Sequence, residues 1–401
     1  INMVIFMKYL IFFFSLIFVF LIAYLLSFSK KNIKYKLPSI LTLLTLEIIV
    51  ASTMLNTTIG LATLDGIASG IHYIINYANK GIDFVFGDIS SKTSMVFVVV
   101  ALLPLIFICS IIGIFKYIGA LDLIINTIGF LINKISKVGK LESFAAISAV
   151  IVGMMPAYVS IKDYIPRLSK AQMYTIAACT VSTVDIALLG AYTQMVEPRY
   201  VFIGVSLNFF STFIIVSIIN PSEPTNITTC PLGANKGERG SFFEVLTDHM
   251  QDAFKLILAI VPIIIGFVAL ISMLNDVFLN ILGISFQGIL GYIFSPLAFI
   301  LGSSWDESVT FGTIIATKIL SNEFVAMIDY MKLTSITPRT DAIMSVFLIS
   351  FANFGSIGMI IGCVTSISRE HGKMIASNSF RLIVGSTLVS CLSATIVGIF
   401  V

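Results

Sequence analysis

Residues 143–158 read SFAAISAVIVGMMPAY, an apolar stretch that is interrupted at Gly153-Met154-Met155-Pro156. The stretch has cations on both sides, at Lys134, Lys137 and Lys140 before it and at Lys162, Arg167 and Lys170 after it. In a membrane protein, positively charged loops stay in the cytoplasm, so these flanks predict that the stretch enters and leaves the membrane on that face. Such a re-entrant hairpin is tolerated only where its backbone is buried in protein or lines a cavity.

A second interrupted segment covers residues 286–320. It is apolar up to Gly302-Ser303-Ser304-Trp305-Asp306-Glu307 and apolar again to Thr317, and the little positive charge at its ends favours the outer side. A short polar turn and long helices follow each interrupted segment, so the order hairpin, helix, helix occurs twice with opposite orientation. This is the inverted-repeat plan of secondary transporters, whose broken helices meet near the membrane midplane.

The composition agrees with a membrane location. Of the 401 residues, 57% are apolar and only 11% are charged, against about 25% charged residues in a soluble domain. Uncharged runs long enough to cross a bilayer as helices cover residues 9–29, 93–115, 200–222, 256–275, 277–305, 342–368 and 382–401. The chain is therefore predicted to be an all-α polytopic membrane protein, which excludes a water-soluble enzyme. Its 24 cations and 21 anions are too balanced for a nucleic-acid binder, and its five scattered cysteines give no disulfide or metal framework.

Flanking charge also predicts the topology. The first apolar run is too long for a signal peptide and is read as a retained span. The basic cluster at residues 30–36 then places the N-terminus outside, and the cations at 369–381 place the start of the last span inside and its end outside. Two outward termini require an even number of crossings, and about eight fit. Residues 38–53 form a second span with Glu47 near its middle, residues 59–90 and 119–138 suit interfacial helices, and residues 223–241 form a long polar loop.

The chain also resembles a known family over essentially its whole length. The stretches that carry the resemblance are GKLESFAAISAVIVG (139–153), MYTIAACTVSTVDIALLGAY (173–192), SFQGILGYIF (285–294), ATKILSNEFVAM (316–327), SVFLISFANFGSIGMIIG (345–362) and GSTLVSCLSATIVGI (385–399). They are similar to the concentrative nucleoside transporters, in particular to the bacterial nucleoside permeases.

The resemblance implies a homotrimer in the lipid of the cell inner membrane, with a mobile transport domain that exposes one central site to each side in an elevator-like movement. On this plan, residues 1–138 hold scaffold and interfacial helices and residues 139–219 the first hairpin repeat of the transport domain. Residues 220–275 hold the polar loop and a scaffold helix, and residues 276–401 the second hairpin repeat.

Site residues follow from the same resemblance. The family's ribose-binding acid falls on Glu307, and its FANFSS motif falls on residues 351–356, where Gly355 replaces a serine. Asn353 and Ser356 would bind the sugar together with Glu307. Phe351 and Leu188 would line the base pocket.

The tip of the first hairpin departs from the family. Where the family shows Gly-Gln-Ser/Thr-Glu, whose polar residues read the nucleobase, this chain has Gly153, Met154, Met155 and Pro156. Two lost hydrogen bonds, at about 1–3 kcal/mol each, would weaken an ordinary nucleoside roughly 10²- to 10⁴-fold. Either Met154 and Met155 hold the base by apolar contact, or the substrate is a modified nucleoside or another small polar metabolite.

Asp185 is the one acid in the otherwise uncharged stretch from Ala171 to Val196. An ionised carboxylate at that depth costs at least about 2.5 kcal/mol unless it is paired, so intramembrane acids are functional candidates. By resemblance, Val152, Thr183 and Val184 contribute to the family's sodium site, but Ala149 stands where sodium-coupled members supply an asparagine. Three interpretations stay open: Asp185 carries a coupling proton, it replaces the lost oxygen at a sodium site, or it is a structural acid satisfied by neighbouring hydroxyls.

Three other acids lie within or beside the apolar segments. Glu47 is interpreted as an interhelical structural contact, and Asp306 as a helix N-cap or a solvated acid. Glu323 either pairs with Lys318 or takes part in the coupling network.

The sequence thus predicts a secondary importer that couples nucleoside uptake to a cation, with protons slightly favoured over sodium and with no other cofactor and no bound metal. A same-fold transporter of another metabolite is the main rival, and a passive channel is a remote one. An intramembrane hydrolase using Asp185 and Glu307 is disfavoured, because the chain has no HExxH, GxGD or GxSxG motif.

Overall fold

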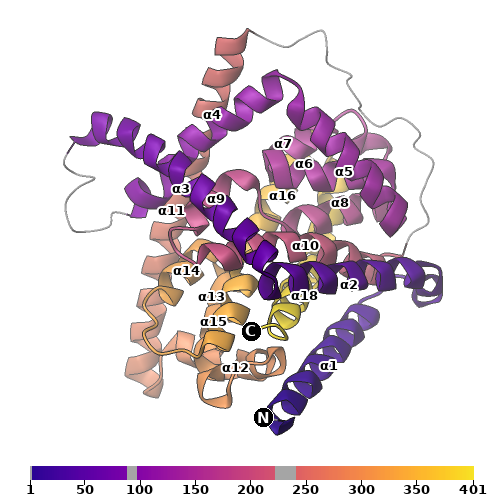
Figure 1. The fold of residues 1–401 in the computed structure, drawn as a ribbon, viewed down its shortest axis with the longest axis vertical. Coiled ribbons are helices and arrows are strands. Elements are labelled where there is room, and N and C mark those ends of the chain that lie inside the picture. The colour runs from indigo at the N-terminus through magenta and orange to yellow at the C-terminus, as the bar shows by residue number, and fades with distance from the viewer. Residues whose placement is uncertain (1, 88–96, 222–240) are drawn as a thin grey trace.

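The computed structural model describes residues 2–87, 97–221 and 241–401, and throughout these ranges the regular structure is helical (Figure 1). The predicted polar loop 223–241 lies outside the described residues, apart from Ser241. The longer helices are α1 (Asn2–Leu25), α2 (Ile33–Asn56), α3 (Thr58–Phe86), α4 (Pro104–Tyr117), α5 (Ala120–Ser136), α6 (Lys140–Val152), α8 (Lys170–Ser182), α10 (Pro198–Ile219), α11 (Phe242–Leu282), α12 (Phe286–Leu301), α13 (Trp305–Leu320), α15 (Pro338–Leu348), α16 (Phe354–Ile367) and α18 (Ser379–Val397). The shorter ones are α7 (Met154–Ser160), α9 (Ile186–Tyr192), α14 (Glu323–Tyr330) and α17 (Arg369–Ser377).

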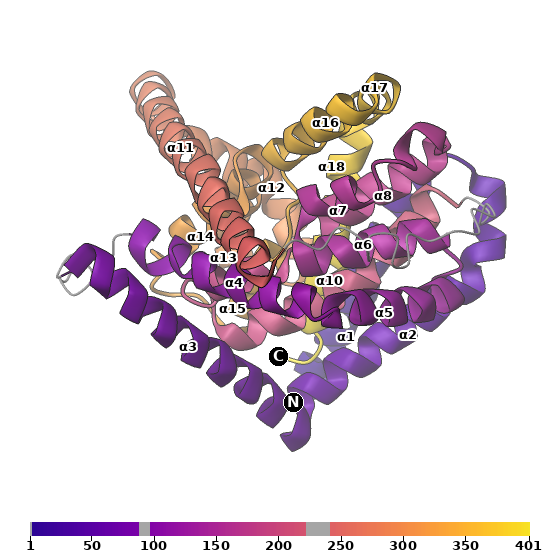
Figure 2. The ribbon, with the colours of Figure 1, turned by 90° about the horizontal axis from the view of Figure 1, so that it is seen from above.

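Eight helical segments of the described chain are long and apolar enough to cross a membrane. They are α1, α2, α3, α4 with the turn before it, α8 together with α9, α10, α11 and α18. The all-α polytopic fold is therefore confirmed. Figure 2 shows α10 near the centre of the molecule and α3 and α11 at its edge. Their burial agrees, because 78% of the α10 span is inside the protein against 11% of the α3 and α11 spans, so the two edge helices present apolar side chains outward.

The basic segments meet at one end of the helices. Lys36 at the start of α2 donates from Nζ to the Lys137 carbonyl oxygen at 2.6 Å. The guanidinium of Arg381 lies 4.0 Å from the centre of the Phe28 ring, which links the start of α18 to the loop after α1. A shared basic face is what the positive-inside rule requires of cytoplasmic loops.

The two chain ends of the helical bundle also lie together. Lys8 near the start of α1 donates from Nζ to the carbonyl oxygen of Val401, beyond α18, at 2.6 Å. Both ends are on the same side in the ribbon views (Figures 1 and 2).

The structure repeats one plan twice, but the second copy does not begin where the sequence analysis placed it. The first copy is the hairpin α6–α7, then α8 and α9 as one broken helix, then α10. In the segment 286–320 a bend of 115° between α12 and α13 confirms the predicted break at Gly302. A second break follows at Ser321-Asn322, between α13 and α14.

Helix lengths identify which of these two pairs matches the first hairpin. Helices α6 and α7 have 13 and 7 residues, and α13 and α14 have 16 and 8. The second hairpin is therefore α13–α14, with its tip at Asn322, and α12 precedes it as α5 precedes α6. The broken helix α15–α16 and then α18 complete the second copy.

Close backbone contact holds α12 against α13. A Cβ atom added at Gly312 would lie 2.3 Å from the carbonyl oxygen of Gly291 and 2.8 Å from the amide nitrogen of Ser295, both on α12. Backbone atoms cannot yield as side chains do, so a methyl group at Gly312 must push the helices apart.

We therefore expect Gly312→Ala to lower the melting temperature of the detergent-purified protein, with a cost of about 1–3 kcal/mol, although alanine is the better helix former. Gly266→Ala on α11 is the matched control, because a Cβ there meets nothing within 4 Å. Equal melting temperatures for the two variants would contradict the proposed close approach. Thermal unfolding followed by size-exclusion chromatography measures both.

Candidate functional site

The tip of the second hairpin carries a buried carboxylate that contacts both repeats. Asn322 caps α14 by accepting a hydrogen bond from the Val325 amide at 2.9 Å, which places Glu323 in the first turn. Glu323 Oε1 accepts from the Tyr192 hydroxyl at 3.1 Å, at the end of α9 in the first repeat. Its Oε2 accepts from Asn353 Nδ2 at 2.9 Å, at the break between α15 and α16. All three side chains are buried.

The α15–α16 break brings together the residues that the FANF motif predicts. Asn353 is the N-cap of α16, and its Oδ1 accepts from the Ser356 amide at 2.7 Å. Phe351 is buried two residues earlier, and its carbonyl oxygen accepts from the Asn353 amide. Gly355 faces the hairpin tip, since a Cβ atom there would lie 3.7 Å from the Ser321 carbonyl oxygen. Leu188 is buried on α9.

Glu307 does not join this cluster, and the expectation that it acts together with Asn353 is not met. It lies in the first turn of α13 and is bound there by Ser304, Thr337 and Thr340, with Ser304 Oγ at 2.8 Å. Glu323 follows the opposite end of this 16-residue helix, which is about 24 Å long. The acid at Asn353 is thus Glu323.

A signal for this acid was present in the sequence. At Ser321-Asn322-Glu323 the apolar run is interrupted, and Asn322, a residue type that often caps helices, is followed by an acid. This pattern is expected at the start of a helix. The Gly302 break, with Asp306 and Glu307 in the first turn of the helix that follows it, carries the same type of signal. The neighbouring Asp306 is exposed in the first turn of α13, after the N-cap Ser304, so it is not the N-cap, and its exposure is consistent with a solvated acid. Glu47 is buried on α2 and accepts a hydrogen bond from the Ser211 hydroxyl of α10, which confirms the interhelical contact.

The tip of the first hairpin approaches Asp185. Gly153 has φ +98°, a conformation that side chains rarely adopt, and a Cβ there would lie 3.3 Å from Asp185 Oδ2. Asp185 is the N-cap of α9, and its Oδ1 accepts from the Leu188 amide at 3.0 Å. The acid is buried, and none of the ion pairs between described residues includes it. The structure thus places Asp185 beside the tip of the hairpin that holds Val152, which is one of the residues expected at the ion site.

The other residues expected at this tip differ in exposure. Met154 is buried, whereas Met155 is 40% exposed, and Val152 is half-buried. Thr183 and Val184 are buried in the α8–α9 break, where the Thr183 hydroxyl donates to the Cys179 carbonyl oxygen at 3.0 Å. Only one of the two methionines is therefore enclosed by this chain.

Two observations connect the hairpin tips. Asp185 and Tyr192 lie at the two ends of the short helix α9, so the same helix contacts both tips. Asp185 also lies within electrostatic range of Glu323. Lys318 is in electrostatic range of Glu323 as well, but its ammonium group makes its hydrogen bonds elsewhere.

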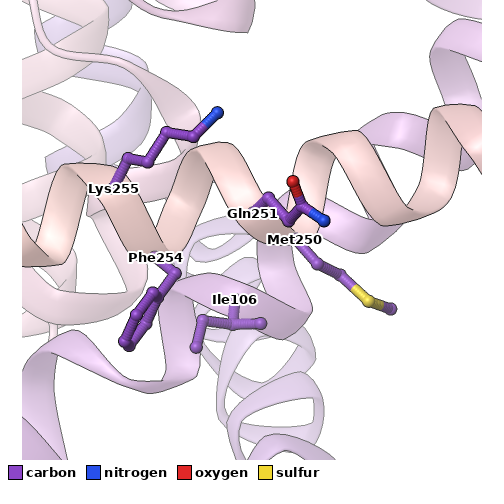
Figure 3. A pocket seen from close by; sticks show the side chains of 5 residues that line it. All are labelled: Ile106, Met250, Gln251, Phe254 and Lys255. Atoms are coloured by element: carbon purple, nitrogen blue, oxygen red, sulfur yellow. The ribbon is translucent and has the colours of Figure 1, made fainter.

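A shallow hollow lies between α4 and α11. It is lined by Ile106, Met250, Gln251, Phe254 and Lys255, and Figure 3 shows Ile106 and Phe254 side by side between the two helices. Its lining is mostly apolar and includes none of the candidate site residues.

Comparisons with known proteins agree with this architecture. Residues 14–89 and 200–398 match the family models described as Na+ dependent nucleoside transporter N-terminus and C-terminus. The purine nucleoside transport protein NupG of Bacillus subtilis is 35% identical over 393 residues, which cover 96% of this chain and 98% of the relative. The nucleoside permease NupC of Helicobacter pylori is 27% identical over 404 residues, with 95% of each chain covered.

Solved structures of a related transporter, CNTnw, share the fold. Its inward-facing substrate-bound state has a TM-score of 0.91 and 26% sequence identity, and a variant in an outward-facing state has a TM-score of 0.92 and 25% identity. Each comparison covers 98% of both chains. With matches over most of its length, two hairpins and two broken helices, this chain belongs to the concentrative nucleoside transporter family, whose members are transporters and not enzymes.

Proposed function

We propose that the protein imports purine nucleosides by cation-coupled symport. The observation that carries this proposal is the buried cluster of Glu323, Asn353 and Ser356, which joins a hairpin tip to a helix break. A carboxylate and an amide side by side offer acceptors and donors in the arrangement that a sugar diol needs. Residues with this chemistry, buried where two repeats meet, are typical of a transporter's central site.

The sugar would bind by replacing the hydrogen bonds that the residues of the cluster make with one another. In the structure Asn353 Nδ2 satisfies Glu323 Oε2, so both groups are paired in a buried environment. A ribose that inserts between them offers hydroxyl groups to both, so neither is left unsatisfied. Glu323 therefore takes the role that the sequence analysis gave to Glu307.

The base would be held mainly by apolar contact. Phe351, Leu188 and the buried Met154 are apolar, and a thioether makes favourable contacts with aromatic rings. A bicyclic purine presents more ring surface than a pyrimidine. The name of the Bacillus subtilis relative as a purine nucleoside transport protein supports the same assignment.

Coupling would take place at Asp185. A buried carboxylate without a cationic side chain needs either a proton or a bound cation, so its charge state changes with the ion that it takes up. We favour a proton as the coupling ion. In the alternative, sodium binds at Asp185 with oxygens of Val152, Thr183 and Val184. For a neutral nucleoside, one positive charge moved across 100 mV supplies about 2.3 kcal/mol, enough for roughly 50-fold accumulation.

The proposal extends to the setting of the transporter. We place it as a homotrimer in the bacterial inner membrane, with both termini outside and an elevator-like transport domain. The basic face near residues 36 and 137 supports a cytoplasmic location of that end. The exposed apolar sides of α11 and α3 suit lipid or subunit contacts.

We expect Glu323→Gln to reduce adenosine uptake into proteoliposomes by about 10- to 150-fold, because hydrogen bonds to a charged group contribute about 1.5–3 kcal/mol. Glu307→Gln is the matched control and should retain uptake within a few-fold. A larger loss of uptake in Glu307→Gln than in Glu323→Gln would return the sugar-binding role to Glu307.

The substrate class is tested by comparing the uptake of labelled adenosine, inosine, uridine and ribose in one assay. If none of the three nucleosides is taken up by folded protein, the result would favour another metabolite.

The coupling role is tested with Asp185→Asn, which keeps an N-cap acceptor for α9 and removes the titratable group. We expect uptake to lose its dependence on an imposed proton gradient while the melting temperature stays near that of the parent. A raised half-saturating sodium concentration with an unchanged pH profile would assign sodium instead. Unaltered dependence on both gradients would leave Asp185 a structural acid.

A further inference from the structure

Lys318 is a fully buried lysine in the α13 arm of the second hairpin. Its Nζ donates to the Phe347 carbonyl oxygen, to Ser350 Oγ at 2.7 Å and to Ser390 Oγ at 3.2 Å. It also lies 4.4 Å from the centre of the Phe347 ring. None of the ion pairs recorded within residues 2–87, 97–221 and 241–401 includes it.

The surroundings of this ammonium group resemble a binding site for a small cation. An ammonium group has three N–H donors, and the three acceptors around Nζ match them in number. Phe347 and Ser350 lie at the C-terminal end of α15, where free carbonyl groups and the helix dipole attract positive charge. A buried charge is tolerated when it is hydrogen-bonded in this way.

The internal repeat gives this position a counterpart in the first half. Gly153 and Asn322 are the N-caps of α7 and α14, so Ala149 and Lys318, four residues before each, correspond. Asp185 and Asn353 are the N-caps of α9 and α16, so Ser182 and Ser350, three residues before each, also correspond.

The counterpart in the first repeat has the same helix end but no cationic side chain. Ala149 is buried and ends in a methyl group. The carbonyl oxygen of Cys179, which corresponds to that of Phe347, accepts from the Thr183 hydroxyl at 3.0 Å. The N-cap residue at the break of the first repeat is a carboxylate, Asp185, whereas the second repeat has the neutral Asn353 at the corresponding position.

We propose that Lys318 is a tethered cation that permanently fills the second repeat's equivalent of the exchangeable cation position in the first repeat. One hairpin then carries its own positive charge through the transport cycle, and only the other takes a cation from solution. On this proposal, one exchangeable cation moves with each substrate. The link to coupling rests on the proposed function, whereas the role of Lys318 as a cation does not.

The tethered cation is tested first by chemical rescue of stability. Lys318→Ala leaves space for a small cation, and Lys318→Met fills the space without a charge. We expect both variants to melt below the parent. Methylammonium should raise the melting temperature of Lys318→Ala in proportion to the logarithm of its concentration, while the parent and Lys318→Met do not respond. Parental stability of Lys318→Met, or no selective recovery of Lys318→Ala, overturns the proposal.

The converse substitution tests the correspondence between the repeats. Ala149→Lys places a tethered ammonium group in the first hairpin, with Ala149→Met as the size-matched control. We expect Ala149→Lys to be at least as stable as Ala149→Met and to bind labelled adenosine without the sodium or pH dependence of the parent. Retained dependence, or lower stability than Ala149→Met, counts against the proposal. If the parent binds no nucleoside, the proposed function fails, and the methylammonium measurement still decides the role of Lys318.

Discussion

A helix that ends inside a membrane leaves backbone amides and carbonyls without water to satisfy them, and each unsatisfied group costs several kcal/mol. This chain has four such interruptions in its two repeats, at Gly153, Asn322, Asp185 and Asn353. Side chains at three of them cap the following helix, and Gly153 adopts a backbone conformation that only glycine tolerates well. The same polar groups that make the breaks possible are those available to a ligand, so the site is a consequence of how the fold closes its helix ends.

The first repeat could be predicted closely from the sequence, because its charges and its glycine act together. Lysines on both sides of residues 143–158 exclude a simple crossing, and Gly153-Met154-Met155-Pro156 marks a single interruption. The residue that approaches this tip, Asp185, was also identifiable, because it is an isolated acid in an uncharged stretch. Its closeness to Gly153 depends on how α6 packs against α9, which no local pattern records.

The second repeat was harder because it contains two interruptions separated by one helix. Gly302 and Asn322 each follow an apolar run and each precede an acid, so local signals do not rank them. What separates them is tertiary: Glu323 reaches Tyr192 and Asn353, whereas Glu307 is bound by the threonines at the start of α15. Internal symmetry could have decided between them, since only the α13–α14 pair repeats the long and short arms of α6–α7.

The two repeats share a backbone plan but differ in how they carry charge. The second repeat places a lysine and a glutamate within a few residues of one hairpin tip, each buried and each hydrogen-bonded to neutral groups. The first repeat places a single aspartate at its break and no cation in its hairpin arms near the tip. A pair of opposite built-in charges keeps its balance whatever the solution contains, whereas a lone buried carboxylate needs a counter-charge from outside. If Asp185 takes up the coupling cation as proposed, charge balance confines exchange with the solution to the first repeat and leaves the second repeat to supply fixed groups for the solute.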